Sequence, residues 1–219
     1  MNIENINPKD IEAMSMQIIE SELGDTSHLS ECEKIVVKRV IHTTADFDYL
    51  NNLKFSPNAV DIAKNAFRRG VVIVTDTQMA LSGISKPALG KLGCRAYCFM
   101  ADEDVKKTAS EKGITRAIAA MDKAAESFGG ENVIFVIGNA PTALLRVHEM
   151  IQSGKMKPSL VVGVPVGFVN VEYSKNLIMQ TDVPFIVAKG RKGGSTVAAA
   201  VCNAVLYQIF DRESGKITD

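Results

Sequence analysis

From Phe55 onward the sequence alternates between short β-branched runs and longer amphipathic segments, and this alternation limits the possible folds more than any other feature. The short runs have the length of strands, and the first of them, VVIVTD, has the composition of a buried strand. They are VVIVTD, RAYCFM, NVIFVIG, SLVVGVP and PFIVAKG. Residues 115–128, 140–154 and 194–210 carry apolar residues at helical spacing. Strands alternating with helices of this length predict βαβ units, and therefore a three-layer α/β/α sandwich around a mostly parallel sheet.

The stretch before Phe55 is helical in pattern. Asn7-Pro8 supplies an N-cap and a proline for the first helical position. A second helix is expected to begin near Ser30, because Glu33 lies three residues on, as in a capping box. We therefore expect a helical N-terminal segment in front of the sandwich, and one domain over residues 1–219.

The composition narrows the class of protein. Hydrophobic residues make up 46% of the chain and charged residues 23%, so a packed core is expected and disorder is not. Lys plus Arg and Asp plus Glu both total 25, which argues against a general binder of nucleic acid or membrane surfaces. Without a signal-like N-terminus or an apolar run near the ~20 residues that span a bilayer, the expected location is the cytoplasm.

The four cysteines are better explained as small thiols than as a metal site or disulfides. Only Cys94 and Cys98 are close, and their spacing fits neither a CxxC pair nor a zinc finger. The sequence predicts no metal site.

Four loops follow the predicted strands, and ligands of such sheets bind beyond the carboxyl ends of the strands. The loops are TDTQMA (75–80), GNAPTA (138–143), GVPVGF (163–168) and KGRKGGS (189–195).

The last of these loops is the most basic. Lys189, Arg191 and Lys192 precede Gly193, Gly194 and Ser195, which open a helix. Free amides at a helix N-terminus attract anions, so this loop could cradle a phosphate or a carboxylate. It could equally be a solvated basic turn with Ser195 as a helix cap. The spacing is not that of a Walker loop.

Two further polar residues lie at strand ends. Asp76 ends the predicted strand segment VVIVTD, and Asn139 directly follows NVIFVIG. Each could contact a ligand, although taken alone each is explained more simply by a hydrogen bond within its own turn.

Of the three histidines, His42 is the candidate for chemistry. His28 falls in a polar loop and His148 in a predicted helix, whereas His42 lies at the end of an element beside Thr43, Thr44 and Asp46. Histidine exchanges protons near neutral pH, because its reference pKa is about 6.5. The neighbouring hydroxyls and carboxylate could fix its tautomer. No GxSxG element and no second histidine at metal spacing accompany it, which favours general acid–base chemistry.

Eight segments in order along almost the whole chain resemble the precorrin-8X and cobalt-precorrin-8 methylmutase family of cobalamin biosynthesis. They are MSMQIIESE, RVIHTTADFDY, FSPNAV, TDTQMALSGI, TRAIAAM, GNAPTAL, GVPVGFVNVEYSK and GRKGGSTVAAAVCNA. Each motif is weak alone, and their order over the chain makes the resemblance specific.

The resemblance implies an α/β/α fold and a homodimer with the site near the subunit interface. It implies an isomerisation that moves a methyl group from C-11 to C-12 of a corrin-type ring, helped by protonation and without a cofactor. The family's catalytic histidine falls on His42 and its substrate-contacting serine on Ser15. Its carboxylate-binding arginines fall on Arg39 and Arg116.

The other expected contacts to the ring and its acidic arms come from the residues described above. They are Thr43, Asp76, Asn139, Arg191, Gly194 and Ser195. The substrate class implied is a corrinoid tetrapyrrole, with or without cobalt.

The sequence departs from the family at one place. The family usually reads GFVxxxESK, whereas here Tyr173 stands before Ser174 and Glu172 lies one position earlier, so Glu172 is left out of the site.

Two other functions remain open on the sequence. One is a non-catalytic corrinoid carrier using the same pocket, and the other is a phosphate- or nucleotide-binding protein using the basic glycine loop.

Overall fold

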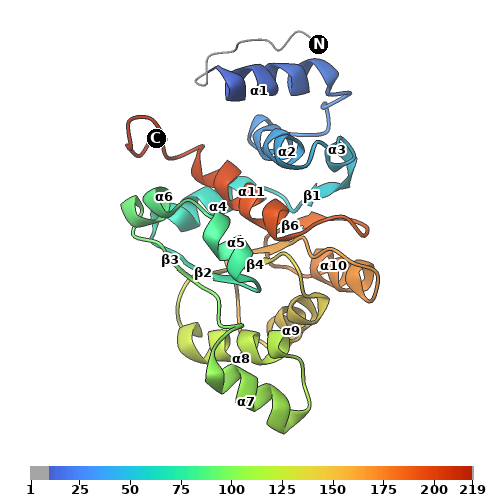
Figure 1. Ribbon diagram of the computed structural model, residues 1–219, viewed down its shortest axis with the longest axis vertical. Coiled ribbons are helices and arrows are strands. Elements are labelled where there is room, and N and C mark those ends of the chain that lie inside the picture. The colour runs from blue at the N-terminus through green and yellow to red at the C-terminus, as the bar shows by residue number, and fades with distance from the viewer. Residues whose placement is uncertain (1–9, 219) are drawn as a thin grey trace, which may run out of the picture.

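The computed structural model describes residues 10–218, and these residues contain a six-stranded sheet in the order β1-β6-β5-β4-β2-β3 (Figure 1). All neighbouring strands are parallel except β1, which pairs antiparallel with β6. The strands are β1 (Leu53–Phe55), β2 (Val72–Thr75), β3 (Arg95–Tyr97), β4 (Val133–Ile137), β5 (Leu160–Gly163) and β6 (Phe185–Ala188).

Helices cover both faces of this sheet. One side carries α2 (Glu31–Thr44), α4 (Ala59–Arg68), α5 (Gln78–Gly83), α6 (Lys86–Lys91) and α11 (Ser195–Leu206). The other side carries α7 (Glu103–Lys112), α8 (Arg116–Phe128), α9 (Pro141–Gln152) and α10 (Val171–Met179). Figure 1 shows α7, α8 and α9 together below the sheet and α2 and α11 above it.

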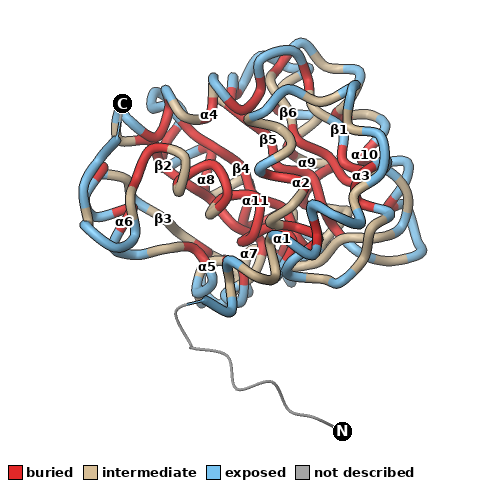
Figure 2. Tube along the Cα trace, turned by 90° about the horizontal axis from the view of Figure 1, so that it is seen from above, coloured by how far each residue is buried: buried red, intermediate tan, exposed pale blue. Residues whose placement is uncertain are grey.

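The central strands are buried throughout, as their apolar runs predict. Alternate side chains of a strand point to opposite faces. Accordingly Ile134 and Val136 of β4 belong to the core on the α11 side, while Phe135 and Ile137 belong to the core on the α8 side. Figure 2 shows these buried segments in the interior and the exposed ones at the rim. The predicted three-layer α/β/α sandwich is confirmed.

The helical N-terminal segment is also confirmed. It consists of α1 (Ile11–Glu22), α2 and the short α3 (Tyr49–Asn52). Ser30 and Glu33 form the predicted capping box at the start of α2. α1 packs on α2 at the outside of the molecule, with Ile19 as its one buried residue. The predicted cap at Asn7-Pro8 lies outside the described residues.

The alternation of strand and helix did not predict every element. α5 and α6 have six residues each, which is too short for a periodic pattern. α10 was missed because its buried stripe combines Val171 and Ile178 with two polar residues, Ser174 and Lys175.

The four cysteines are free, with Cys98 and Cys202 buried and Cys32 and Cys94 half-buried. Within residues 10–218, no helix has both the length and the apolar character to cross a membrane.

Candidate functional site

The four predicted loops meet at one edge of the sheet, because parallel strands place their carboxyl ends together. Hydrogen bonds join the loops across long stretches of sequence. The hydroxyls of Thr77 and Ser195 lie 2.8 Å apart. The amide of Gly194 donates to the carbonyl of Val164 at 2.8 Å, and that of Gly167 donates to the carbonyl of Arg191 at 3.2 Å. The loops therefore form one surface.

The buried side chain of Asp76 connects the loop after β2 to the loop after β4. Its side chain is fully buried, and its carboxylate accepts hydrogen bonds from the amides of Gly138, Asn139 and Ala140 at 2.8, 2.8 and 2.6 Å. Burial raises the pKa of Asp76, and the three amide bonds act in the opposite direction. The expected ligand contact is corrected here, because both carboxylate oxygens are already bonded inside the protein. Asp76 positions the loop after β4.

The side chain of Asn139 is exposed at the same edge, above the loop that Asp76 fixes. Thr115 caps α8 through the amide of Ile118 and also donates to the hydroxyl of Thr142 at 3.1 Å. This bond places the start of α8, and with it the exposed Arg116, beside the start of α9. Asn139 and Arg116 therefore remain available to a ligand.

The basic glycine loop is folded tightly against the loop after β5. A Cβ on Gly193 would lie 2.1 Å from the carbonyl oxygen of Val164, so a side chain cannot be accommodated there without movement. Gly194 has a φ of 132° and precedes α11. No side chain caps α11, so the alternative of Ser195 as a helix cap is wrong. Ser195 is instead the first helical residue, and the amides of this first turn have no partner within the helix.

Two cations of this loop, Arg191 and Lys192, already have acidic partners. Lys192 lies 2.6 Å from both Asp46 and Asp48, and these bonds raise the pKa of Lys192 and lower that of Asp46. Arg191 is exposed, pairs with Glu172 at 3.1 Å and lies over the ring of Phe168 at 5.6 Å. Glu172, which the sequence left out of the site, thus contacts a residue that it included.

Lys175 is a contributor that the sequence analysis missed. Its side chain is fully buried, and its ammonium donates to the carbonyls of Gly190 and Lys192 at 2.8 Å each. It therefore holds the basic loop from inside. The spacing of residues could have indicated that Lys175 is buried. Val171, Lys175 and Ile178 follow the helical period that marks a buried stripe.

His42 lies exposed in the last turn of α2, one residue before Thr43. The hydroxyls of Thr43 and Thr44 donate to the carbonyls of Arg39 and Val40, both at 2.9 Å. The nearby carboxylate of Asp46 binds Lys192. The idea that these neighbours fix the tautomer of His42 is therefore wrong for this arrangement, because their hydrogen bonds go elsewhere. The imidazole is free to meet a ligand.

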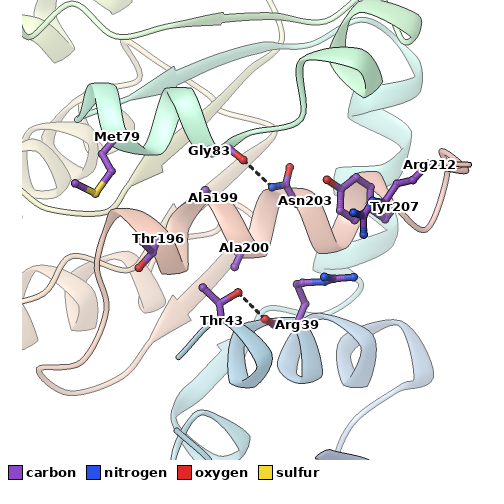
Figure 3. Close-up of a pocket in the computed structure, with 10 residues that line it drawn as sticks. All are labelled: Arg39, Thr43, Met79, Gly83, Thr196, Ala199, Ala200, Asn203, Tyr207 and Arg212. Atoms are coloured by element: carbon purple, nitrogen blue, oxygen red, sulfur yellow. Dashed lines mark hydrogen bonds between the residues drawn. The ribbon is translucent and has the colours of Figure 1, made fainter. Parts of the chain in front are cut away.

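A groove of about 370 Å³ runs along α11 between α2 and α5, and two predicted residues, Arg39 and Thr43, line it (Figure 3). Its floor consists of small residues, Gly83, Ala199 and Ala200. The full lining is Arg39, Thr43, Met79, Gly83, Thr196, Ala199, Ala200, Asn203, Tyr207 and Arg212. The groove is therefore apolar along its floor, with two guanidinium groups among the polar residues that border it.

The floor is fixed by close helix packing. A Cβ on Gly83 would lie 2.8 Å from the Cβ of Ala199, so α5 and α11 approach closely only because residue 83 is glycine. Asn203 donates to the carbonyl of Gly83 at 2.8 Å and accepts from the amide of Ser85 at 2.8 Å. The opposite wall is α2, whose Thr43 lies along the groove with Thr196 and Ala200 of α11.

Ser15 is half-buried on α1 and donates to the carbonyl of Ile11 at 2.9 Å. It is not among the residues that line the groove, although Glu12 of the same helix binds Arg39. In the part of the chain that the structure describes, no group of three or more His, Cys, Asp or Glu residues could hold a metal ion.

Residues 10–208 match the family model for precorrin-8X methylmutase. The cobalt-precorrin-8 methylmutase of Leptospira interrogans is 47% identical over 205 residues, covering 90% of this chain and 92% of the relative. The precorrin-8X methylmutase of Pseudomonas aeruginosa is 38% identical over 178 residues, covering 80% and 84%. The crystal structure of precorrin-8X methylmutase from Thermus thermophilus superposes with a TM-score of 0.81 at 38% identity, covering 90% of this chain and 96% of that one.

Proposed function

The chain belongs to the precorrin-8X methylmutase family, an isomerase family of cobalamin biosynthesis, and we propose that it moves a methyl group from C-11 to C-12 of precorrin-8 or cobalt-precorrin-8. The product would be hydrogenobyrinate or cobyrinate. The proposal includes a homodimer located in the cytoplasm, and no bound cofactor.

The observation that carries the substrate assignment is the groove along α11. The corrin-type substrate is flat and largely apolar, with acetate and propionate arms at its edge. A floor of Gly83, Ala199 and Ala200 suits the face of such a ring. Arginine suits its arms, because a planar guanidinium can bind a carboxylate through two parallel hydrogen bonds. Arg39 and Arg212 both line the groove.

Beyond the groove, the loop surface offers further contacts to the arms. Asn139 and Arg191 present exposed side chains there, and Gly194 and Ser195 begin α11, whose free amides favour an anion. We assign Arg116 and Ser15 to arms on either side of this surface, and Thr43 to the wall beside His42. Asp76 and Lys175 act through the loops that they hold.

We assign His42 the role of proton donor. The methyl group migrates within one molecule, so the reaction requires neither a nucleophile nor an acceptor. Protonation of the conjugated ring by the imidazolium of His42 draws electron density from the region that the methyl group leaves, and the neutral imidazole that remains can take a proton back once the methyl group has moved. His42 is exposed and lies at the end of α2 beside Thr43, which lines the groove.

The test is turnover of cobalt-precorrin-8 by His42→Ala, compared with His148→Ala as a control on the distant helix α9. Loss of general acid catalysis reduces rates by about 10²–10⁴-fold, so product formation should fall by at least the lower factor. Binding of the product corrinoid should persist in both variants. An unchanged rate in His42→Ala would remove this residue from the mechanism, and absence of product with the unmodified chain would leave only a corrinoid carrier.

A further inference from the structure

One acidic side chain joins α1 to the arginines of the groove. The carboxylate of Glu12 lies 2.7 Å from Arg39, and both of its oxygens accept hydrogen bonds from Arg212 at 2.9 Å. Arg39 and Arg212 lie 27 and 200 residues away from Glu12 in the sequence. The fold therefore brings α1, α2 and the segment after α11 together around one carboxylate.

The two guanidinium groups are held in place by a shared aromatic ring. Arg39 lies over the ring of Tyr207 at 5.6 Å from its centroid, and Arg212 lies at 4.8 Å. All three residues line the groove and gather at one end of α11 (Figure 3). The ring orients both arginines before a ligand arrives, so they lose less side-chain freedom when an anion binds. The two arginines therefore form a receptor for a carboxylate.

Glu12 itself belongs to a helix that is loosely attached. Ile19 is the one buried residue of α1, Met16 packs half-buried against the same core, and Glu20 forms ion pairs with Lys34 and Lys38 of α2. The carboxylate side chain of Glu12 is 41% exposed. Ion pairs at such exposed sites are weak because water screens them, so a competing anion can exchange with them.

We propose that Glu12 is an internal substitute for a ligand carboxylate. In the ligand-free chain it occupies the Arg39–Tyr207–Arg212 receptor, and a carboxylate arm of the bound ring displaces it. Binding then releases the start of α1 from α2, and Arg212 becomes a residue that selects for a carboxylate at that edge of the ring. The identity of the ligand rests on the proposed function.

Such competition lowers the apparent affinity for the ligand. An attached carboxylate competes at the high effective concentration of a tethered group, and the strength of one exposed ion pair corresponds to a change of about 1.5- to 5-fold. Removing the charge of Glu12 should therefore tighten binding by this factor. If Glu12 serves only to hold α1 against the site, removing its charge should instead weaken ligand binding.

The experiment compares Glu12→Gln with Glu20→Gln by spectroscopic titration with cobyrinate and with its methyl ester. Glu20→Gln loosens α1 without freeing the groove arginines, so it is the matched control. We expect tighter binding of cobyrinate in Glu12→Gln alone, no change for the ester, and loss of the gain when Arg212→Ala is added. Mellitate, a small ring bearing only carboxylates, is titrated calorimetrically as a second probe and should show the same pattern.

Equal or weaker mellitate binding in Glu12→Gln would overturn the inference, as would the same gain in Glu20→Gln. Tighter mellitate binding in Glu12→Gln, with no binding of cobyrinate by any variant, would support the carboxylate receptor and contradict the proposed corrinoid function. The two proposals can therefore fail separately.

Discussion

Replacing Lys175 with methionine should reveal how much a buried ammonium destabilises this fold. Burial lowers the pKa of Lys175 from its ordinary 10.5 to about 8, with a smaller opposing effect of the Glu172 carboxylate. The side chain is fully buried, so solvent does not screen this effect. Each pKa unit corresponds to about 1.4 kcal/mol, so the charged form is disfavoured in the folded state by about 3 kcal/mol.

The sign of the pH dependence follows from proton binding. Below pH 8 both the folded and the unfolded chain hold the proton on Lys175. Between about pH 8 and 10.5 only the unfolded chain holds it, so the contribution of this group to folding stability rises with pH. A neutral amine still has two N–H groups for the carbonyls of Gly190 and Lys192, which allows the folded state to lose the charge without losing both bonds.

The assay is urea unfolding of the unmodified chain and Lys175→Met at a series of pH values across that window. The free energy of unfolding of the unmodified chain, relative to that of the variant, should rise by about 3 kcal/mol between the two ends of this pH window. The hydrogen bonds that the variant lacks add a difference that does not depend on pH, so they do not affect this rise. Lys54→Met, which removes an exposed lysine from β1, controls for the loss of one positive charge. A difference that stays constant across the window would refute the reasoning.

Three other substitutions test the loops and the site. Gly193→Ala places a Cβ 2.1 Å from a carbonyl oxygen and should lower the Tm, whereas Gly90→Ala, with nothing within 4 Å, should not; equal Tm values would contradict the packing argument. Asp76→Asn leaves fewer acceptors for the three loop amides that Asp76 binds and should reduce the free energy of unfolding by about 1–3 kcal/mol in urea titrations, so an unchanged midpoint would count against its role. Arg116→Ala should weaken cobyrinate binding by about tenfold, since a carboxylate loses a charged partner, and equal affinities in a spectroscopic titration would exclude that contact.

The sequence predicted the central strands of the sheet well, because a strand that is buried on both faces consists of a continuous run of apolar residues. The run VIFVI became β4 with all five residues buried, and the loops after β2, β4, β5 and β6 lie at one edge because parallel strands must end there. The candidate site was predicted in part. Thr43 and Arg39 line the groove, whereas Asp76 is buried and the tautomer partners of His42 are bonded elsewhere.

The alternation of strands and helices by itself determined the sandwich, since the period of apolar residues is a property of neighbouring positions. The tertiary structure alone decided which polar groups far apart in the sequence meet. Glu12 meets Arg212 across 200 residues, and Thr77 meets Ser195 across 118, because strand order and helix packing bring these side chains within bonding distance. Local periodicity carries no information about such pairs, so their partners, and with them the shape and charge of the groove, emerge only when the layers assemble.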